Sequence, residues 1–183
     1  MARLVGVAGS LRKGSYNAAL LRAAAELAPA GMAVEIATIA GIPLYDGDLE
    51  REHGIPEPVA TLKERIAGAD GLLIVTPEYN SSIPGVLKNA IDWLSRPASD
   101  ISRVFGDKPV AIMGATPGGA GTRLSQAAWL PVLRTLGTRA FFGKQLYVSG
   151  ASAVFDAEGK VVDEKIAKLL AGFMAGFAAF VGK

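Results

Sequence analysis

Three short runs of the sequence are apolar almost throughout, and each leads into a polar loop that contains glycine. They are LVGVA at residues 4–8, GLLIVT at residues 71–76 and PVAIMG at residues 109–114. A strand with one face in water alternates apolar and polar residues, whereas a strand covered on both faces does not. These runs therefore predict strands buried within a parallel sheet that has helices on both faces.

The segments between these runs alternate between helical and extended patterns. Apolar residues recur at helical spacing in residues 17–28, 58–69, 84–97, 124–136 and 163–182. Two more strands are expected at residues 33–39 and 138–148, the second interrupted at Gly143 and Lys144. Because no repeat or linker breaks this order, we expect one domain over residues 1–183. Its predicted fold is α/β, with three α/β/α layers and a five-stranded parallel sheet in the flavodoxin-like order 2-1-3-4-5.

The three polar loops follow the first, third and fourth predicted strands. They span residues 9–17, 77–85 and 115–123. Sheets of this kind bind ligands outside the carboxyl ends of their strands, near the point where strand order reverses. In the predicted order the three loops are neighbours at that edge, so together they predict one binding crevice.

The first loop has the composition of an anion site. Free backbone N–H groups at a helix start, hydroxyls and a guanidinium suit a phosphate dianion, and these come from Ser10, Arg12, Ser15, Tyr16 and Asn17. The alternative is that the loop only makes a turn and caps a helix, with Asn17 as the cap. The loop matches neither GxxxxGK[ST] nor GxGxxG, so a phosphate site here has a different design.

The second and third loops offer surfaces for the rest of a nucleotide-like ligand. In the second, Tyr79 provides a flat ring, while Asn80 and Ser82 provide hydrogen bonds. Glu78 either orients this loop or is a surface acid. In the third loop, Thr116 is followed by glycines, including Gly118, that let the backbone approach a flat ring closely. The alternative for the third loop is a mobile segment without ligand contacts.

Composition excludes several classes of site. The chain has no cysteine, which rules out disulfides, thiolate nucleophiles and cysteine-held metal clusters, and is consistent with a cytoplasmic protein. A net charge of +2 with scattered basic residues gives no electrostatic case for nucleic acid or a membrane surface. The single histidine, His53, lies in a charged stretch and is expected in a solvated loop, so we predict no metal site.

Two further segments bear on organisation. No signal-peptide pattern is present at the start, and residues 169–182 are uncharged but shorter than the ~20 residues that span a bilayer. We therefore expect residues 163–182 to form a buried or interface helix and predict no membrane insertion. Residues 41–56 read as a long loop, which either borders a site or is a surface excursion.

Two motifs in this order resemble one known family. The stretches GSLRKGSYN from Gly9 and PEYNSSIPGVLKNAIDW from Pro77 are similar to those of NADPH-dependent FMN reductases, in the group that includes chromate and quinone reductases. The resemblance covers nearly the whole chain. It implies that FMN is bound and that NADPH or NADH is the co-substrate. The residues implied to hold FMN are Ser10, Arg12, Ser15, Tyr16, Asn17, Pro77, Glu78, Tyr79, Asn80, Ser82, Thr116 and Gly118.

The resemblance also implies a reaction and an assembly. The flavin takes a hydride from NAD(P)H and passes electrons to a small acceptor such as a quinone, free flavin or chromate in a ping-pong scheme, so no catalytic side chain is named. A homodimer or homotetramer is implied, with helices after the second and third loops packed across the interface. Arg96 and Arg123 are candidate anion contacts, although an ordinary solvated role is the simpler reading. The third loop departs from the family pattern at Gly121 and Thr122.

Two other functions compete with this one. A flavodoxin-like electron carrier would bind FMN without turning over a pyridine nucleotide. Flavodoxins are typically strongly acidic and carry a TxTGxT loop, whereas this chain is slightly basic and lacks that motif. A binding or regulatory module that has kept the fold and lost the flavin is the third alternative. Anaerobic mixing with NADPH and a titration with FMN separate the three.

Overall fold

The computed structural model describes residues 1–182 and is built on one parallel sheet. Its strands are β1 (Ala2–Ala8), β2 (Met32–Ala37), β3 (Gly71–Val75), β4 (Pro109–Ala115), β5 (Arg139–Ala140) and β6 (Tyr147–Val148). They are ordered β2-β1-β3-β4-β5, with β6 also paired to β4, and every pairing is parallel. The predicted strand order is confirmed.

The fifth position of the sheet is divided between two very short strands. β4 pairs with β5 through Pro109 and Val110, and with β6 through Gly114 and Ala115. Residues 141–146 leave the sheet between these pairings. The single interrupted strand predicted at 138–148 is therefore two separate strands, and the sheet has six strands instead of five.

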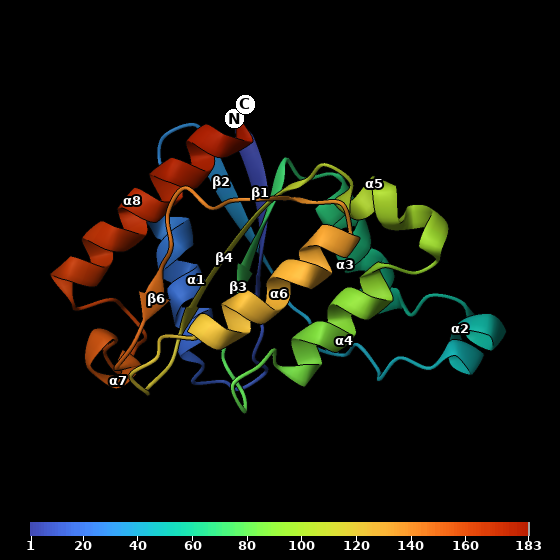
Figure 1. Cartoon of the computed structure of the whole chain (residues 1–183), viewed down its shortest axis with the longest axis horizontal. Helices are drawn as coiled ribbons and strands as arrows, with labels where there is room; N and C mark the ends of the chain where they lie inside the picture. Colours follow the sequence, from blue (N-terminus) through green and yellow to red (C-terminus); the bar gives the residue numbers. More distant parts are fainter. Residues whose placement is uncertain (183) are drawn as a thin grey trace.

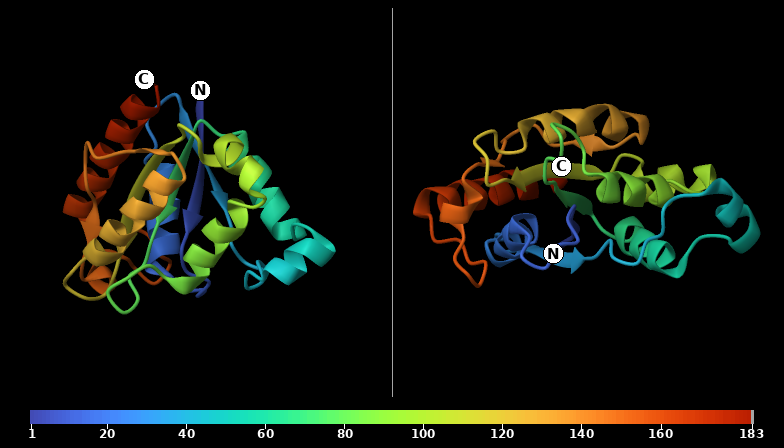
Figure 2. Two further views of the ribbon diagram at one scale, coloured as in Figure 1. Left: turned by 45° about the vertical axis from the view of Figure 1, so that its right-hand side comes forward. Right: turned by 90° about the horizontal axis from the view of Figure 1, so that it is seen from below.

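Helices cover both faces of the sheet, which gives the three predicted layers (Figures 1 and 2). They are α1 (Tyr16–Glu26), α2 (Gly47–His53), α3 (Glu57–Ala67), α4 (Gly85–Leu94), α5 (Ile101–Phe105), α6 (Arg123–Thr135), α7 (Ala151–Val154) and α8 (Glu164–Val181), with a 3₁₀ turn at Ala98–Asp100. One buried cluster joins α1, α7 and α8 to the sheet, and a second joins α3, α4, α5 and α6 to the opposite face.

The continuous apolar runs supply both clusters at once. Leu73 and Val75 of β3 belong to the cluster under α1 and α8, whereas Leu72 and Ile74 belong to the cluster under α3 and α4. Successive side chains of a strand point to opposite faces, so a strand between two helical layers is apolar at every position. Helix α8 packs its apolar residues against the sheet in the same way, as expected for a buried helix.

Several local elements differ from the sequence prediction. The predicted loop at 41–56 contains α2, which begins after Asp46, whose carboxylate accepts a hydrogen bond from the Asp48 N–H at 2.8 Å. His53, expected in a loop, is the last residue of α2 and is exposed. The 3₁₀ turn and α5 were not predicted. Helix α6 continues through Pro131, so this proline is not a boundary.

The loops after β1, β3 and β4 gather at one end of the sheet, and the chain termini lie at the other end (Figure 1). None of the described helices has the length and apolarity needed to cross a membrane. Within residues 1–182, no three histidine, aspartate or glutamate side chains are grouped to hold a metal ion.

Candidate functional site

The first and second loops are in direct contact. The Gly9 N–H donates to the Val75 carbonyl oxygen at 2.9 Å, which continues the β1–β3 pairing into the loops. A Cβ atom at Gly9 would lie 3.0 Å from Pro77 and closer still to Leu87, so the two loops approach as only glycine permits. The Tyr79 hydroxyl reaches the Ser10 hydroxyl at 3.5 Å. The crevice predicted between these loops is therefore narrow at its base.

The first loop presents unpaired donors at the start of α1. Ser15 is the N-cap, and its hydroxyl oxygen accepts from the Ala18 N–H at 3.3 Å. Among the described residues, the N–H groups of Ser10, Tyr16 and Asn17 have no protein acceptor. The Arg12 guanidinium has no carboxylate partner there either, and lies 5.6 Å from the centre of the Tyr16 ring. These groups fit a phosphate dianion.

Asn17 has a different role from the predicted helix cap. Its side chain is buried, with only 4% of the residue exposed, and it pairs with the backbone of Ala115 at the end of β4. The Asn17 amide donates to the Ala115 carbonyl oxygen at 2.9 Å, and the Ala115 N–H donates to the Asn17 side-chain oxygen at 2.9 Å. Both polar groups of the side chain are thus occupied. Asn17 ties the start of α1 to the third loop and can offer an anion only its backbone N–H.

The second loop is a tight hairpin. Tyr79 and Ser82 exchange backbone hydrogen bonds at 3.2 and 3.0 Å, and the two residues between them have positive φ angles, 50° at Asn80 and 59° at Ser81. Asparagine tolerates this left-handed backbone better than most residues, which suits a two-residue turn. The hairpin leaves Tyr79 49% exposed. Its ring is therefore free to line the crevice.

The third loop is anchored by its neighbours. A Cβ atom at Gly114 would overlap the Thr76 carbonyl oxygen, so β4 passes the end of β3 at a distance that only glycine allows. The Thr116 N–H donates to the Val148 carbonyl oxygen at 2.9 Å, and the Gly118 carbonyl accepts from the Gly150 N–H at 3.1 Å. The predicted alternative of a loop without ligand contacts is not tested by these bonds, but they fix both of the predicted flavin contacts, Thr116 and Gly118.

Glu78 belongs to the second loop but contacts the helix that follows the third. One of its carboxylate oxygens accepts from the Leu124 N–H at 2.8 Å and from the Ser125 N–H at 3.1 Å. These N–H groups are at the start of α6. Glu78 therefore orients a loop instead of acting as a free surface acid.

The two candidate arginines both have protein partners. Arg96 donates to the Glu50 carboxylate at 2.8 Å, and this bond holds the pKa of Glu50 below its ordinary value. The Tyr45 hydroxyl donates to the same carboxylate at 3.0 Å, which raises the pKa of that hydroxyl. Arg123 lies 5.2 Å from the centre of the Tyr147 ring. Neither arginine points unpaired into the crevice.

The segment before α2 is fastened to α4. The Pro43 carbonyl oxygen accepts from the Asn89 side-chain amide at 2.8 Å and from the Trp93 indole N–H at 2.9 Å. The Tyr45 N–H donates to the Asn89 side-chain oxygen at 2.9 Å. Trp93 is completely buried, so of the two positions considered for it, core or partner subunit, it occupies the core.

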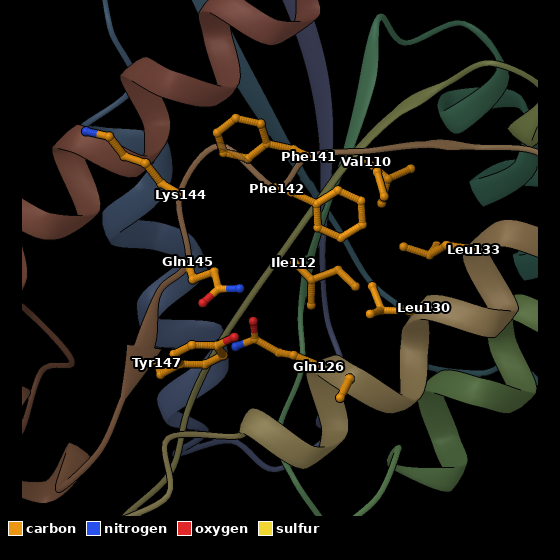
Figure 3. Close-up of a pocket in the computed structure, with 12 residues that line it drawn as sticks. Val110, Ile112, Gln126, Leu130, Leu133, Phe141, Phe142, Lys144, Gln145 and Tyr147 are labelled. Atoms are coloured by element: carbon orange, nitrogen blue, oxygen red, sulfur yellow. The ribbon is translucent and has the colours of Figure 1, made fainter.

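A separate hollow of about 220 Å³ lies beside the free edge of β4 (Figure 3). Figure 3 shows its apolar end formed by Ile112, Leu130 and Phe142, and its polar end by Gln126 and Gln145. None of the twelve residues predicted to hold FMN lines it. The predicted binding crevice and this hollow are therefore different features of the surface.

A family model described as NADPH-dependent FMN reductase matches residues 2–153. The chain belongs to the NADPH-dependent FMN reductase family. The matched region contains all three loops, so the resemblance noted from the motifs at Gly9 and Pro77 is confirmed. The enzyme class, FMN as cofactor and NAD(P)H as co-substrate are those that define this family.

Named relatives and a solved structure agree with the family. The chain is 44% identical to an NAD(P)H-dependent FMN reductase of Pseudomonas aeruginosa, over 92% of this chain and 89% of that protein. It is 40% identical to a quinone reductase of Escherichia coli K12, over 98% and 95%. The structure of FerB, a flavoenzyme NAD(P)H:(acceptor) oxidoreductase from Paracoccus denitrificans, is similar with a TM-score of 0.88 and 36% identity, covering 100% of this chain and 98% of that one.

Sequence reasoning missed the buried residues that fix the FMN reductase loops in place. Thr76, Ser125 and Trp129 are fully buried and hydrogen-bonded to one another beneath the second loop. The sequence contained one signal, since Thr76 is a hydroxyl residue at the last position of an otherwise apolar run. A buried hydroxyl needs a partner, and here the partners come from α6.

Proposed function

We propose that this chain binds FMN in the crevice formed by the three loops and reduces quinones with NAD(P)H. The observation that carries the proposal is the set of unpaired N–H groups and the unpaired Arg12 at the start of α1, next to the exposed ring of Tyr79. An anion site and a flat amphipathic surface side by side suit a phosphorylated planar cofactor. The family and its quinone-reducing relatives support the same assignment.

The residues divide into two groups by the part of FMN they would hold. Ser10, Arg12, Ser15 and Tyr16, with the Asn17 N–H, would bind the phosphate, because they surround the free helix start. The ring and its ribityl chain would lie along the second loop and the start of the third, at Pro77, Tyr79, Asn80, Ser82, Thr116 and Gly118. Glu78 would act through α6 and not through the cofactor.

When bound, FMN supplies the redox chemistry, taking a hydride from NAD(P)H and passing electrons to a second substrate after the nicotinamide nucleotide has left. The protein binds and orients the two substrates in turn at one open surface. Quinones, free flavin and chromate are the proposed acceptors. No side chain at the crevice is needed as a nucleophile or general base, so we assign no catalytic residue.

An exposed apolar face supports the proposed homodimer or homotetramer. Helix α6 leaves Leu124 52% exposed and Leu130 41% exposed, and this helix follows the third loop, where the interface was expected. Light scattering after size-exclusion chromatography measures the assembly, and a monomeric mass would contradict the proposal. A cytoplasmic location remains a prediction, which localisation of the tagged protein in its host would check.

The decisive experiment measures cofactor and turnover together. We expect the purified protein to be yellow, to oxidise NADPH or NADH when a quinone is added, and to give parallel lines in double-reciprocal plots, as a ping-pong scheme requires. Free FMN and chromate are then tested as acceptors in the same assay. A colourless protein that FMN cannot reconstitute would refute the proposal, and FMN that NADPH cannot reduce would indicate an electron carrier.

Arg12 provides the matched test of the phosphate site. Arg12→Ala removes a charge-assisted contact of about 1.5–3 kcal/mol, so the Kd for FMN should rise by roughly tenfold to a hundredfold. Arg134→Ala is the control, because Arg134 is also exposed but lies in the last turn of α6. Equal Kd values for the two variants would remove Arg12 from the site.

A further inference from the structure

Helix α6 begins without a side-chain cap of its own. Thr122 precedes it in the left-handed region, with φ at 64°, and makes no cap hydrogen bond. The Thr122 hydroxyl instead accepts from the Gln126 side-chain amide at 3.1 Å. The first N–H groups of a helix lack acceptors within the helix, so they need an outside partner or water.

Glu78 supplies that partner from the other loop. Its carboxylate oxygen accepts from Leu124 at 2.8 Å and from Ser125 at 3.1 Å, although it lies 46 residues before Leu124 in the chain. A negative charge at a helix N-terminus is also favoured by the helix dipole. The cap thus links two loops that are distant in sequence.

A second connection lies directly beneath the first. The Thr76 and Ser125 hydroxyls are 2.9 Å apart, and the Trp129 indole N–H donates to the Thr76 hydroxyl oxygen at 3.2 Å. All three residues are fully buried. The Thr76 hydroxyl also donates to the Pro77 carbonyl oxygen at 2.9 Å. Residues 76–78 and the first two turns of α6 therefore form one hydrogen-bonded unit.

We propose that Glu78 is a positioning residue, which holds the second and third loops at a fixed separation through the start of α6. This inference rests on the proposed function, because the two loops are the ones assigned to the flavin ring. Glu78 then contributes to FMN affinity without contacting FMN. Its effect depends on a hydrogen-bond acceptor at the correct reach, and only secondarily on its charge.

Two substitutions separate reach from charge. Glu78→Gln keeps a side-chain oxygen at the same reach but removes the charge, whereas Glu78→Asp keeps the charge on a side chain that is one methylene shorter. We expect the Kd for FMN to stay within about threefold of the parent protein in Glu78→Gln, and to rise about tenfold in Glu78→Asp and Glu78→Ala, the scale of a lost helix cap. Glu57→Ala is the control, because Glu57 is an exposed glutamate in the first turn of α3.

Hydrogen exchange of the FMN-free protein gives a readout that does not depend on the cofactor. The amides of Leu124 and Ser125 should exchange about tenfold faster in Glu78→Ala and Glu78→Asp, and close to the parent rate in Glu78→Gln. Faster exchange with an unchanged Kd would overturn the proposal, because Glu78 would then stabilise only the helix. Loss of affinity in Glu78→Gln with retention in Glu78→Asp would overturn it as well, since that pattern indicates a direct charge contact. Failure of the parent protein to bind FMN would refute the proposed function alone.

Discussion

Removing the Asn17 side chain should destabilise the protein far more than removing a similar asparagine elsewhere. In Asn17→Ala, the N–H and C=O groups of Ala115 lose their partners at a position that is only 2% exposed. An unsatisfied buried polar group costs about 1–3 kcal/mol, so two of them should lower the free energy of unfolding by about 2–5 kcal/mol. This is a large share of the ~5–15 kcal/mol that stabilises a typical domain.

Asn89 is the matched control, because it also bridges a backbone N–H and a backbone C=O. Its partners are less dependent on it. The Tyr45 N–H is exposed and can bond to water, and the Pro43 carbonyl oxygen keeps its bond from Trp93. Asn89→Ala should therefore cost only about 1 kcal/mol. Urea unfolding followed by far-ultraviolet circular dichroism, with FMN removed, measures both values.

An acidic substitution adds a pH-dependent test of the same contact. In Asn17→Asp the ionised carboxylate cannot donate to the Ala115 carbonyl oxygen, but the protonated form can. Burial and this bond should raise the pKa of the introduced carboxyl in the folded state, so the variant should be most stable below about pH 4 and lose stability as the pH rises through the raised value. Equal costs for Asn17→Ala and Asn89→Ala, or a variant that gains stability as the pH rises, would refute the role assigned to Asn17.

Three further changes test other contacts. Gly114→Ala places a methyl group onto the Thr76 carbonyl oxygen, so it should cost about 1–3 kcal/mol or more in urea unfolding and weaken FMN binding in a dialysis assay. Lys63→Met removes the buried ammonium group that donates to the Arg96 carbonyl oxygen and should cost about 1.5–3 kcal/mol, measured by the same unfolding assay. The bond from Arg96 lowers the pKa of Glu50, so its stabilising effect is present above the pKa of the unfolded chain and is lost as the pH falls through the folded value. Glu50→Gln should therefore flatten the acid side of a plot of Tm against pH, and an unchanged plot would contradict this.

The buried strands could be predicted because burial on both faces leaves a mark at every position. Residues 71–76 are apolar without interruption, and β3 is buried throughout. Helix α2 left no such mark, because none of its residues is buried and it therefore has no apolar stripe. Its only signals were the Asp46 cap and the acidic residues of its first turn. The strands β5 and β6 have two residues each, too few for any periodicity.

The binding loops could be located from the sequence, but the roles within them could not be fully assigned. Ser10, Arg12 and Tyr79 were correctly predicted to lie close together, because parallel strands place their carboxyl ends at one edge. Asn17 and Glu78 were harder, since each pairs with a segment that is distant in the chain, 98 residues away for Asn17. An asparagine near a helix start fits a local cap equally well. Only the packing of α1 and α6 against the strand ends decides between the two roles.

The two tryptophans give this protein an internal optical probe. Trp129 is hydrogen-bonded beneath the second loop through Thr76, and Trp93 is held by Pro43 on the far side of α4. Flavins absorb light in the range where indoles emit, so FMN in the crevice would quench the emission of the nearby Trp129. Trp93→Phe would leave that indole as a single emitter, and cofactor loading could then be followed in solution without any added label.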